Sequence, residues 1–274
     1  MKLYRLLEEV EKILPGRRKD LEILISHLLK IKPSQIHLQR EREISKEVES
    51  EYLNLVERLK EDVPVEYITG ICYFMDLELR IKEGILIPRP ETELLVERVL
   101  NTIGNDFKGT GLDIGGGTGC ISVALLKKRR NLVMYSNDIN PEAVEIMKLN
   151  AKLHGVEYRF KCEAGNVFNP FEYMVFDFVV SNPPYIPRRK WYYLDEKVKK
   201  EGYNSLIGGE EGTEIYKLIA EGINGVLKRH GFLALEIGHD QGDFVKNLLE
   251  NKGFMVEIYK DYNYQDRIVI AWKL

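Results

Sequence analysis

Apolar residues recur at helical spacing along the first part of the chain. Leucine, isoleucine and valine side chains between residues 3 and 14, and again between residues 21 and 29, fall on one face of a helix. Pro15-Gly16 and Lys32-Pro33 interrupt the pattern, and a third amphipathic stretch follows Ser45, which is placed to cap it. The pattern predicts a small helical domain over residues 1–62.

The spacing changes over residues 63–86, where we expect β character. Cys72-Tyr73-Phe74 and the alternating run 77–81 flank Met75-Asp76, an order that is typical of a hairpin. We expect this segment to be a β-hairpin linker between the helical domain and the rest of the chain.

Residues 87–274 alternate between short apolar runs and helical stretches. Strands are expected near residues 110–115, 132–138, 158–163, 176–181, 231–237, 254–260 and 267–273, and a helix over residues 141–154. This order predicts an α/β fold with a doubly wound sheet. The 274 residues are 44% hydrophobic, which is enough apolar material for a core of that size.

The composition gives no sign of a membrane protein or of a metal-binding protein. The net charge of −3 gives no global sign of a nucleic-acid-binding protein, and we expect neither a membrane span nor a leader sequence. The three cysteines lack metal-ligand spacing and are expected to be reduced thiols of a cytoplasmic protein. Basic residues gather around Trp191-Tyr192-Tyr193, where they could bind RNA phosphates or an acidic protein, or simply form a solvated loop.

The tetrapeptide Asn182-Pro183-Pro184-Tyr185 directly follows the apolar run 176–180. Prolines have no N–H to offer a β-ladder, so the strand must end there and leave an amide side chain, a backbone carbonyl and an aromatic ring at its carboxyl end. Ligands bind at this end of the strands in open α/β sheets. Acceptors beside an aromatic ring suit a planar –NH2 group, although a proline-rich strand exit alone would also explain the sequence.

A glycine-dense turn follows an earlier strand. Asp113 precedes alternating glycines at 115, 117 and 119, a spacing that differs from the dinucleotide-binding Gly-x-Gly-x-x-Gly, and a further acid, Asp138, ends the next strand. An acid at that position is placed to accept both hydroxyls of a ribose. The turn and the acid fit any nucleoside cofactor, and the strand end at Asn182 narrows the choice to S-adenosylmethionine.

Together these segments resemble the class I S-adenosylmethionine-dependent methyltransferases that methylate amino groups. Residues 87–93, Ile-Pro-Arg-Pro-Glu-Thr-Glu, resemble the signature of the protein-(glutamine-N5) methyltransferases of peptide-chain release factors, and residues 64–70, 205–212, 236–238 and 266–267 also match that family. The resemblance covers nearly the whole chain. It implies a helical substrate-recognition domain over residues 1–62 and a Rossmann-like methyltransferase domain over residues 87–274. It also implies S-adenosyl-L-methionine as cofactor and class I release factors as protein partners, methylated on the glutamine of their Gly-Gly-Gln motif.

The same resemblance implies the residues of the site. Catalysis and binding of the target amide fall to Asn182, Pro183, Pro184 and Tyr185, with Arg89 as a further substrate-binding residue. Cofactor binding falls to Asp113, Gly115, Gly116, Gly117, Thr118, Gly119, Asp138, Asn166, Val167 and Asn182, and no metal is expected. Asn166 stands where the family usually has an acid, and its carbonyl oxygen can still accept a hydrogen bond from the adenine amine.

An amide nitrogen is a poor nucleophile because its lone pair is delocalised into the carbonyl. We expect the Asn182 side-chain oxygen and the Pro183 carbonyl each to accept one N–H of the target amide, which favours the transition state as positive charge develops on nitrogen. Tyr185 would pack on the amide plane. Arg89 either orients the cofactor or the substrate, or tethers the hairpin to the sheet.

Two other substrates remain open. A nucleic-acid methyltransferase acting on adenine N6 or guanine N2 would use the same strand end, because an exocyclic amine is also a planar –NH2. Such an enzyme normally carries a basic N-terminal domain, whereas the charges of residues 1–62 are balanced. A ribosomal-protein glutamine methyltransferase would share the chemistry outright. Nucleic acid is thus the less expected substrate.

Overall fold

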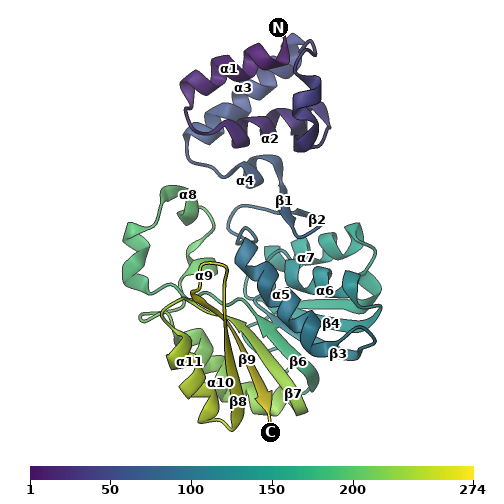
Figure 1. Ribbon diagram of the computed structural model, residues 1–274, viewed down its shortest axis with the longest axis vertical. Coiled ribbons are helices and arrows are strands. Elements are labelled where there is room, and N and C mark those ends of the chain that lie inside the picture. Colours follow the sequence, from purple (N-terminus) through teal and green to yellow (C-terminus); the bar gives the residue numbers. More distant parts are fainter. The chain divides into compact units, whose positions relative to one another are not determined.

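The computed structural model describes residues 1–274 and divides into two units, Met1–Ile71 and Cys72–Leu274. Figure 1 shows helices alone in the first unit, and a sheet covered by helices in the second. No helix in either unit combines the length and the apolar character that crossing a bilayer requires.

The first unit is a helical bundle built from the amphipathic stretches of the sequence. Its helices are α1 (Leu3–Ile13), α2 (Arg18–Leu29), the short 3-10 helix η1 (Pro33–Gln39), α3 (Lys46–Lys60) and α4 (Val65–Thr69). Leu6, Leu24 and Tyr52 are fully buried in its core, and the Tyr52 hydroxyl donates to the Leu21 carbonyl at 3.3 Å. Ser45 caps α3 as the sequence predicts, because its hydroxyl accepts from the Val48 N–H.

The expectation of β character throughout residues 63–86 is wrong at its start, where α4 is helical. Pro64 fixes the entry to this helix at φ −54°, the Thr69 hydroxyl donates to the Val65 carbonyl at 2.9 Å, and Gly70 ends the helix with φ +69°. The hairpin itself is confirmed. Strands β1 (Ile71–Phe74) and β2 (Leu77–Arg80) pair around Met75-Asp76.

The second unit contains a seven-stranded sheet in the order β5-β4-β3-β6-β7-β9-β8. The strands are β3 (Lys108–Ile114), β4 (Asn131–Asp138), β5 (Phe160–Ala164), β6 (Phe176–Ser181), β7 (Leu227–Glu236), β8 (Phe254–Lys260) and β9 (Asp266–Lys273). The first five in this order are parallel, and β9 is antiparallel to both of its neighbours. The predicted doubly wound sheet is therefore confirmed, with an antiparallel edge.

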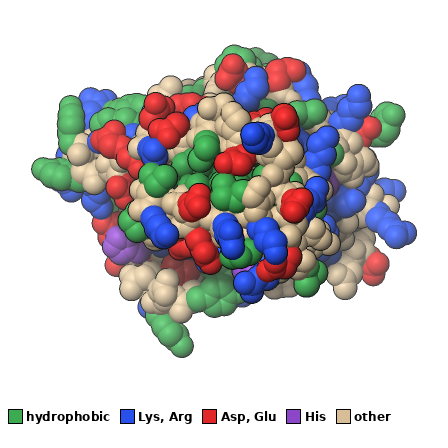
Figure 2. All heavy atoms as spheres, turned by 90° about the horizontal axis from the view of Figure 1, so that it is seen from above, with side chains coloured by type: hydrophobic (Ala, Val, Ile, Leu, Met, Phe, Trp, Pro, Cys, Tyr) green, Lys and Arg blue, Asp and Glu red, His purple; other side chains and the backbone are tan.

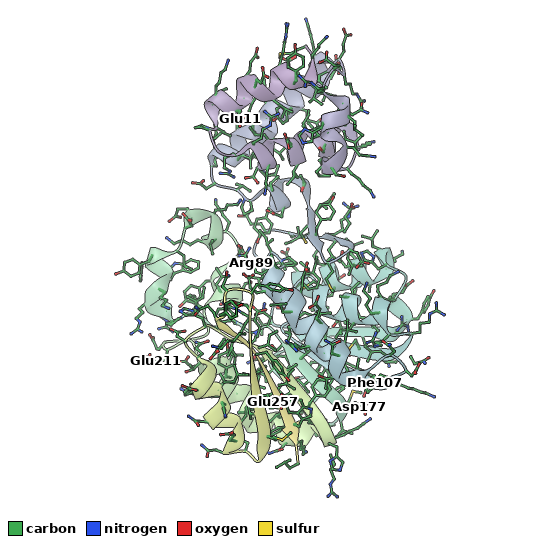
Figure 3. All side chains as sticks on the ribbon, in the orientation of Figure 1. Glu11, Arg89, Phe107, Asp177, Glu211 and Glu257 are labelled. Carbon is green, nitrogen blue, oxygen red and sulfur yellow. The ribbon has the colours of Figure 1, made fainter.

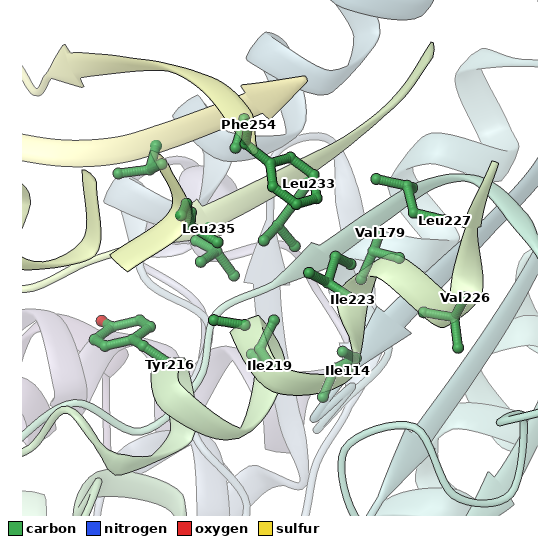
Figure 4. Close-up of a cluster of buried hydrophobic side chains, with 14 of the residues drawn as sticks. Ile114, Val179, Tyr216, Ile219, Ile223, Val226, Leu227, Leu233, Leu235 and Phe254 are labelled. Carbon is green, nitrogen blue, oxygen red and sulfur yellow. The ribbon is translucent and has the colours of Figure 1, made fainter. Parts of the chain in front are cut away.

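Helices cover both faces of this sheet. On one face α5 (Pro90–Ile103), α6 (Cys120–Lys128) and α7 (Pro141–Leu153) lie side by side, and on the other α10 (Glu214–Val226) packs beside α11 (Gly242–Glu250). Figure 4 shows the apolar cluster between the sheet and α10, to which Val179, Leu233 and Ile223 belong. Leu112 and Ile114 of β3 enter this cluster as alternate residues, as do Leu233 and Leu235 of β7, because successive strand side chains point to opposite faces.

The hairpin is fastened to the sheet domain by two polar side chains. The Met75 N–H donates to Glu93 of α5 at 2.6 Å. Asn150 of α7 accepts from the Arg80 N–H at 2.7 Å and donates to the Arg80 carbonyl at 2.9 Å, the pairing that another strand would make. Since both anchors lie in the second unit, the hairpin is held in place independently of the helical bundle.

Candidate active site

A cavity of about 460 Å³ opens at the carboxyl ends of β3, β4 and β6. This is the edge of the sheet where the sequence predicts a ligand. The predicted residues that line it are Gly115, Gly117, Asp138, Asn166, Val167, Asn182, Pro183 and Pro184. The arrangement brings together side chains from three strand ends that are far apart in the sequence.

The glycine turn is shaped by the neighbouring strand end. The N–H groups of Gly115 and Gly116 both donate to the Asn137 carbonyl, at 2.9 and 3.0 Å. Gly115 lies in the left-handed region at φ +71°, and a Cβ built on it would meet no atom within 4 Å. The turn therefore presents bare backbone to open space, which is what close approach of a ligand requires.

Four predicted cofactor residues do not line the cavity but support the turn from behind: Asp113, Gly116, Thr118 and Gly119. Asp113 is fully buried, and its Oδ2 accepts from the Ser122 hydroxyl at 2.7 Å while Oδ1 has no partner. Burial raises the pKa of Asp113 to about 7. A Cβ on Gly116 would lie 2.2 Å from the Ser136 hydroxyl oxygen, so this glycine is needed for packing.

Asp138 ends β4 and fixes the turn through both carboxylate oxygens. Oδ2 accepts from the Gly117 N–H and Oδ1 from the Asn140 N–H, each at 2.9 Å. Burial raises the pKa of Asp138, and these two bonds oppose that effect. Each oxygen keeps a further lone pair, so the carboxylate can still accept from a ligand's hydroxyls.

The loop that carries Asn166 and Val167 is held by a residue that sequence reasoning missed. Asn137, buried at the end of β4, donates to the carbonyls of Val167 and Asn169, both at 2.8 Å. Val167 adopts φ +48°, so the loop turns sharply there. Asn137 stands between Ser136 and Asp138 at the polar end of its strand, so the local sequence provides no signal that sets it apart.

A second, smaller cavity of about 120 Å³ lies beyond the proline turn. Asn182, Pro183 and Pro184 line both cavities, and Tyr185 lines only the smaller one. The Ser181 hydroxyl fixes the start of the turn by donating to the Ile114 carbonyl at 2.7 Å. Two ligand groups, one in each cavity, would therefore meet at Asn182-Pro183-Pro184.

Arg89 precedes α5, at the end of the sheet opposite to Asp177 (Figure 3). Its Nη2 forms an ion pair with Glu201 Oε1 at 2.5 Å, and Glu201 Oε2 accepts from the Ile87 N–H at 3.2 Å. Arg89 lines the smaller cavity, and its partner Glu201 is buried. The ion pair joins the segment before α5 to the loop after α8 (Glu196–Lys199).

Glycines of the segment 205–212 pack directly against the backbone of the proline turn. A Cβ on Gly208 would lie 2.2 Å from the Pro184 carbonyl oxygen, and one on Gly212 would lie 2.4 Å from the Tyr185 carbonyl oxygen. The Gly208 N–H also donates to the Ile186 carbonyl at 3.0 Å. These contacts explain why glycines occur in this segment, which sequence reasoning recorded only as a family resemblance.

We predict that Gly208→Ala lowers the activity of this site, because the added methyl group must displace Pro184. Overpacking of this kind typically costs about 1–3 kcal/mol, which should appear as a lower melting temperature together with a lower kcat. Gly225→Ala is the matched control: a Cβ there meets nothing within 4 Å, and alanine favours the helix α10. A Gly208→Ala enzyme as stable and active as the Gly225→Ala enzyme would contradict this packing argument.

Thr92 and Glu236 are site residues that sequence reasoning did not assign. The Thr92 hydroxyl donates to Glu236 Oε2 at 2.7 Å and accepts from Asn182 Nδ2 at 3.0 Å. The Tyr185 hydroxyl lies 3.5 Å from Glu236 Oε1. Burial raises the pKa of Glu236 to about 7. Both residues lie inside motifs that the sequence analysis matched, but only the fold places them beside Asn182.

The basic aromatic loop after the proline turn is partly neutralised by acids. Arg188 forms an ion pair with Glu210 and donates to the Tyr203 hydroxyl at 3.1 Å, and Lys199 pairs with Glu196 at 2.6 Å. Figure 2 shows acidic and basic side chains interspersed on the face that it draws. This pairing gives no support to a dedicated phosphate-binding patch in the loop.

Known protein families match both parts of the chain. Residues 5–70 match the PrmC N-terminal domain, and residues 90–200 match the methyltransferase small domain. A release factor glutamine methyltransferase from Aquifex aeolicus is 51% identical over 271 residues, which are 99% of this chain and 95% of that protein. This chain belongs to the release factor glutamine methyltransferase family. A second member, from Clostridium acetobutylicum, is 38% identical over 92% of this chain and 90% of its own length.

Solved structures support the fold. A ribosomal protein L11 methylase from Lactobacillus delbrueckii subsp. bulgaricus superposes with a TM-score of 0.53 at 17% identity, covering 72% of this chain and 86% of that one. A methyltransferase from Pyrococcus furiosus also gives 0.53 at 17% identity, over 82% of this chain and 98% of its own. Because the chain belongs to the release factor glutamine methyltransferase family, it is an S-adenosylmethionine-dependent methyltransferase, as the sequence predicts.

The residues of the larger cavity fit S-adenosyl-L-methionine, the methyl donor of this fold. The bare backbone at Gly115 leaves room for a ligand, and Asp138 keeps lone pairs that suit ribose hydroxyls. A cavity of about 460 Å³ is within the range typical of small-molecule sites.

Proposed function

We propose that this protein transfers a methyl group from S-adenosyl-L-methionine to the side-chain amide nitrogen, N5, of the glutamine in the Gly-Gly-Gln motif of class I peptide-chain release factors. The observation that carries the proposal is the turn Asn182-Pro183-Pro184, which lines both cavities. Family membership supports the choice of a release factor as the partner. Because such factors act in translation, we also propose that the enzyme works in the cytoplasm.

On the cofactor side, the chain's residues bind and orient. S-adenosyl-L-methionine, when bound, supplies an electrophilic methyl group, so the chain itself needs no strong electrophile. We assign the nucleoside end to Asp138, Asn166 and Val167 and the methionine end to Gly115 and Gly117. The further predicted residues, Asp113, Gly116, Thr118 and Gly119, are assigned to holding that turn in shape.

On the target side, two acceptors position the amide nitrogen. Asn182 Oδ1 and the Pro183 carbonyl would each accept one N–H of the target, which aims the nitrogen lone pair at the larger cavity. Both acceptors bind a nitrogen that is gaining positive charge more tightly than a neutral one, so they lower the barrier. Pro183 cannot turn its carbonyl away easily, because its ring fixes φ and the following Pro184 restricts its ψ.

Tyr185 supplies a surface rather than a base. Burial raises the pKa of its hydroxyl to about 12, so the phenol stays neutral at physiological pH. We assign its ring to packing on the plane of the target amide, and Arg89 to holding the loop that borders the same cavity. A general base is not required, because the nitrogen becomes acidic once it is methylated.

We further propose that the helical segment 1–62 recognises the release factor, that residues 63–86 form a linker, and that residues 87–274 carry out methyl transfer. The match to a named N-terminal domain supports a separate recognition role. A glutamine in a folded protein needs contacts beyond a cavity of about 120 Å³ to be held in place.

Incubation with labelled S-adenosyl-L-methionine tests the proposal directly. Release factor, a ribosomal protein that carries a methylatable glutamine, and total RNA are offered in parallel, and each is assayed for label. We expect label on the release factor at the Gly-Gly-Gln glutamine, located by mass spectrometry of its peptides. Label on the ribosomal protein or on RNA alone would contradict the proposal and favour one of the two alternative substrates.

We predict that Asp138→Ala weakens cofactor binding more than it slows the bound reaction. Loss of hydrogen bonds to a charged acceptor costs about 1.5–3 kcal/mol, so the Kd for S-adenosyl-L-methionine should rise roughly 10- to 100-fold. The ribose hydroxyls make these contacts equally in the ground and transition states, so kcat at saturating cofactor should change little. Titration calorimetry measures the Kd. An unchanged Kd would mean that Asp138 only caps its strand and the glycine turn.

A further inference from the structure

Three polar side chains from distant parts of the sequence form a chain of hydrogen bonds beside the smaller cavity, which Asn182 and Glu236 both line. Asn182 Nδ2 donates to Thr92 Oγ1 at 3.0 Å, and Thr92 Oγ1 donates to Glu236 Oε2 at 2.7 Å. Thr92 is 2% exposed and Glu236 is 1% exposed. At this degree of burial water does not readily replace a lost hydrogen bond, so each donor in the chain must point at an acceptor.

The direction follows from what each group can donate. A carboxylate has acceptors only, so the Thr92 hydroxyl must give its single hydrogen to Glu236. Its oxygen can then only accept from Asn182, which must turn its –NH2 toward α5. The carbonyl oxygen Oδ1 of Asn182 is thereby left for the cavities that this residue lines.

We propose that Thr92 and Glu236 are positioning residues for methyl transfer, which lock the Asn182 amide in the orientation that presents Oδ1 to the target –NH2. This inference rests on the proposed function, in which Asn182 Oδ1 accepts an N–H of the target amide. A flipped Asn182 would turn its own –NH2 toward the target –NH2. Donor would then face donor, and both would lose their hydrogen bond.

The surroundings of Glu236 set the pH range in which this lock operates. The titratable and charged groups that face it are Glu91 of α5, Cys120 of α6, Tyr185, Tyr216 of α10 and Arg267 of β9. Burial raises the pKa of Glu236 to about 7, although Thr92 and Arg267 oppose this effect. Above that pH the carboxylate enforces the direction of the bonds. Below it the neutral acid can itself donate to Thr92, which frees the hydroxyl hydrogen to point at Asn182.

Three threonine variants test the inference on the full-length enzyme with release factor as substrate. Thr92→Val keeps the shape of the side chain and removes the hydroxyl, Thr92→Ser keeps the hydroxyl, and Thr102→Val makes the same change on the exposed part of α5. At about pH 8 we expect Thr92→Val to lower kcat by roughly tenfold or more, and Thr92→Ser to stay within about threefold of the wild type. The Kd for S-adenosyl-L-methionine should be unchanged in all three, and Thr102→Val should match the wild type.

A Thr92→Val enzyme with wild-type kcat would overturn the inference, and so would a Thr92→Ser enzyme that is as impaired as Thr92→Val. A loss of cofactor affinity large enough to explain the lost rate would also overturn it. If Thr92→Val does not fold, Thr92→Ala is used with the same expectations. Alanine also removes the hydroxyl, but it places no methyl group where the hydroxyl was. Thermal unfolding decides which variant is used.

The pH dependence of kcat provides a second measurement, which would not differ between the variants if Thr92 were purely structural. Between about pH 8 and pH 6 the ratio of wild-type to Thr92→Val kcat should shrink. Only the wild type has the hydroxyl whose hydrogen-bond direction is lost when Glu236 becomes protonated. Rates that fall in parallel would overturn the inference. If the wild-type enzyme puts no label on release factor, the proposed function is contradicted instead. The ratio of wild-type to Thr92→Val kcat is then measured on the acceptor that does take label, and that ratio decides the inference.

Discussion

Replacing Asn182 by alanine is expected to lower kcat by about 10²- to 10³-fold while the fold and cofactor binding survive. The side chain stands at the end of β6, lines both cavities, and has its –NH2 engaged by Thr92. Its removal takes away one preorganised acceptor for a nitrogen that becomes positively charged, and losses of this kind typically cost about 2.7–4 kcal/mol in the barrier. Steady-state kinetics with labelled methyl donor and release factor measure the change.

The control for this substitution is Asn224→Ala, which removes an exposed amide on the last turn of α10 that donates to the Lys252 carbonyl. Its kcat should equal that of the wild type. Circular dichroism and calorimetry with S-adenosyl-L-methionine show whether the Asn182→Ala protein is folded and still binds cofactor. Near-normal turnover by a folded Asn182→Ala enzyme would refute the mechanism proposed for the target amide.

The local pattern of apolar and turn residues was sufficient to predict much of the fold. Each strand of the sheet follows from an apolar run bounded by turn residues, and the positions from β3 to β9 agree with those expected from the sequence. The prolines after Ser181 end β6 because they have no N–H for the ladder, so their place at the strand end could be read directly. Residues 65–69 were misjudged because their β-branched side chains favour strands, whereas Pro64 and Gly70 define one short helix.

The parts of the site that sequence reasoning missed depend on contacts across the fold. Thr92 is 90 residues from Asn182 and 144 residues from Glu236 along the chain, and nothing local reveals that the three meet. Asp113 shows the opposite case. Its motif marked it as a cofactor residue, but the side chain points behind the turn, to Ser122. Spacing can identify a strand end, while only packing decides on which side of the turn each polar group lies.

Removal of the helical unit should separate cofactor binding from recognition of the protein substrate. The core of the helical unit, which includes Leu24 and Tyr52, shares no residue with the cluster under the sheet, which includes Val179 and Ile223. Hairpin residues Met75 and Arg80 are held by α5 and α7. A fragment of residues 72–274 should therefore fold by itself and bind S-adenosyl-L-methionine with an unchanged Kd.

The same fragment is expected to methylate full-length release factor with a kcat/KM lower by about 100-fold, or roughly 2.7 kcal/mol of remote binding energy that no longer positions the glutamine. A short Gly-Gly-Gln peptide is the matched substrate control, because it has no surface for a recognition domain to hold. The peptide should be a weak and equal substrate for the fragment and for the intact chain. A soluble fragment that binds cofactor and methylates full-length release factor as fast as the intact enzyme would show that residues 1–62 do not recognise the substrate. Loss of the peptide activity in the fragment would show instead that the helical unit supports the methyltransferase fold, since the peptide needs only the cavities at Asn182-Pro183-Pro184.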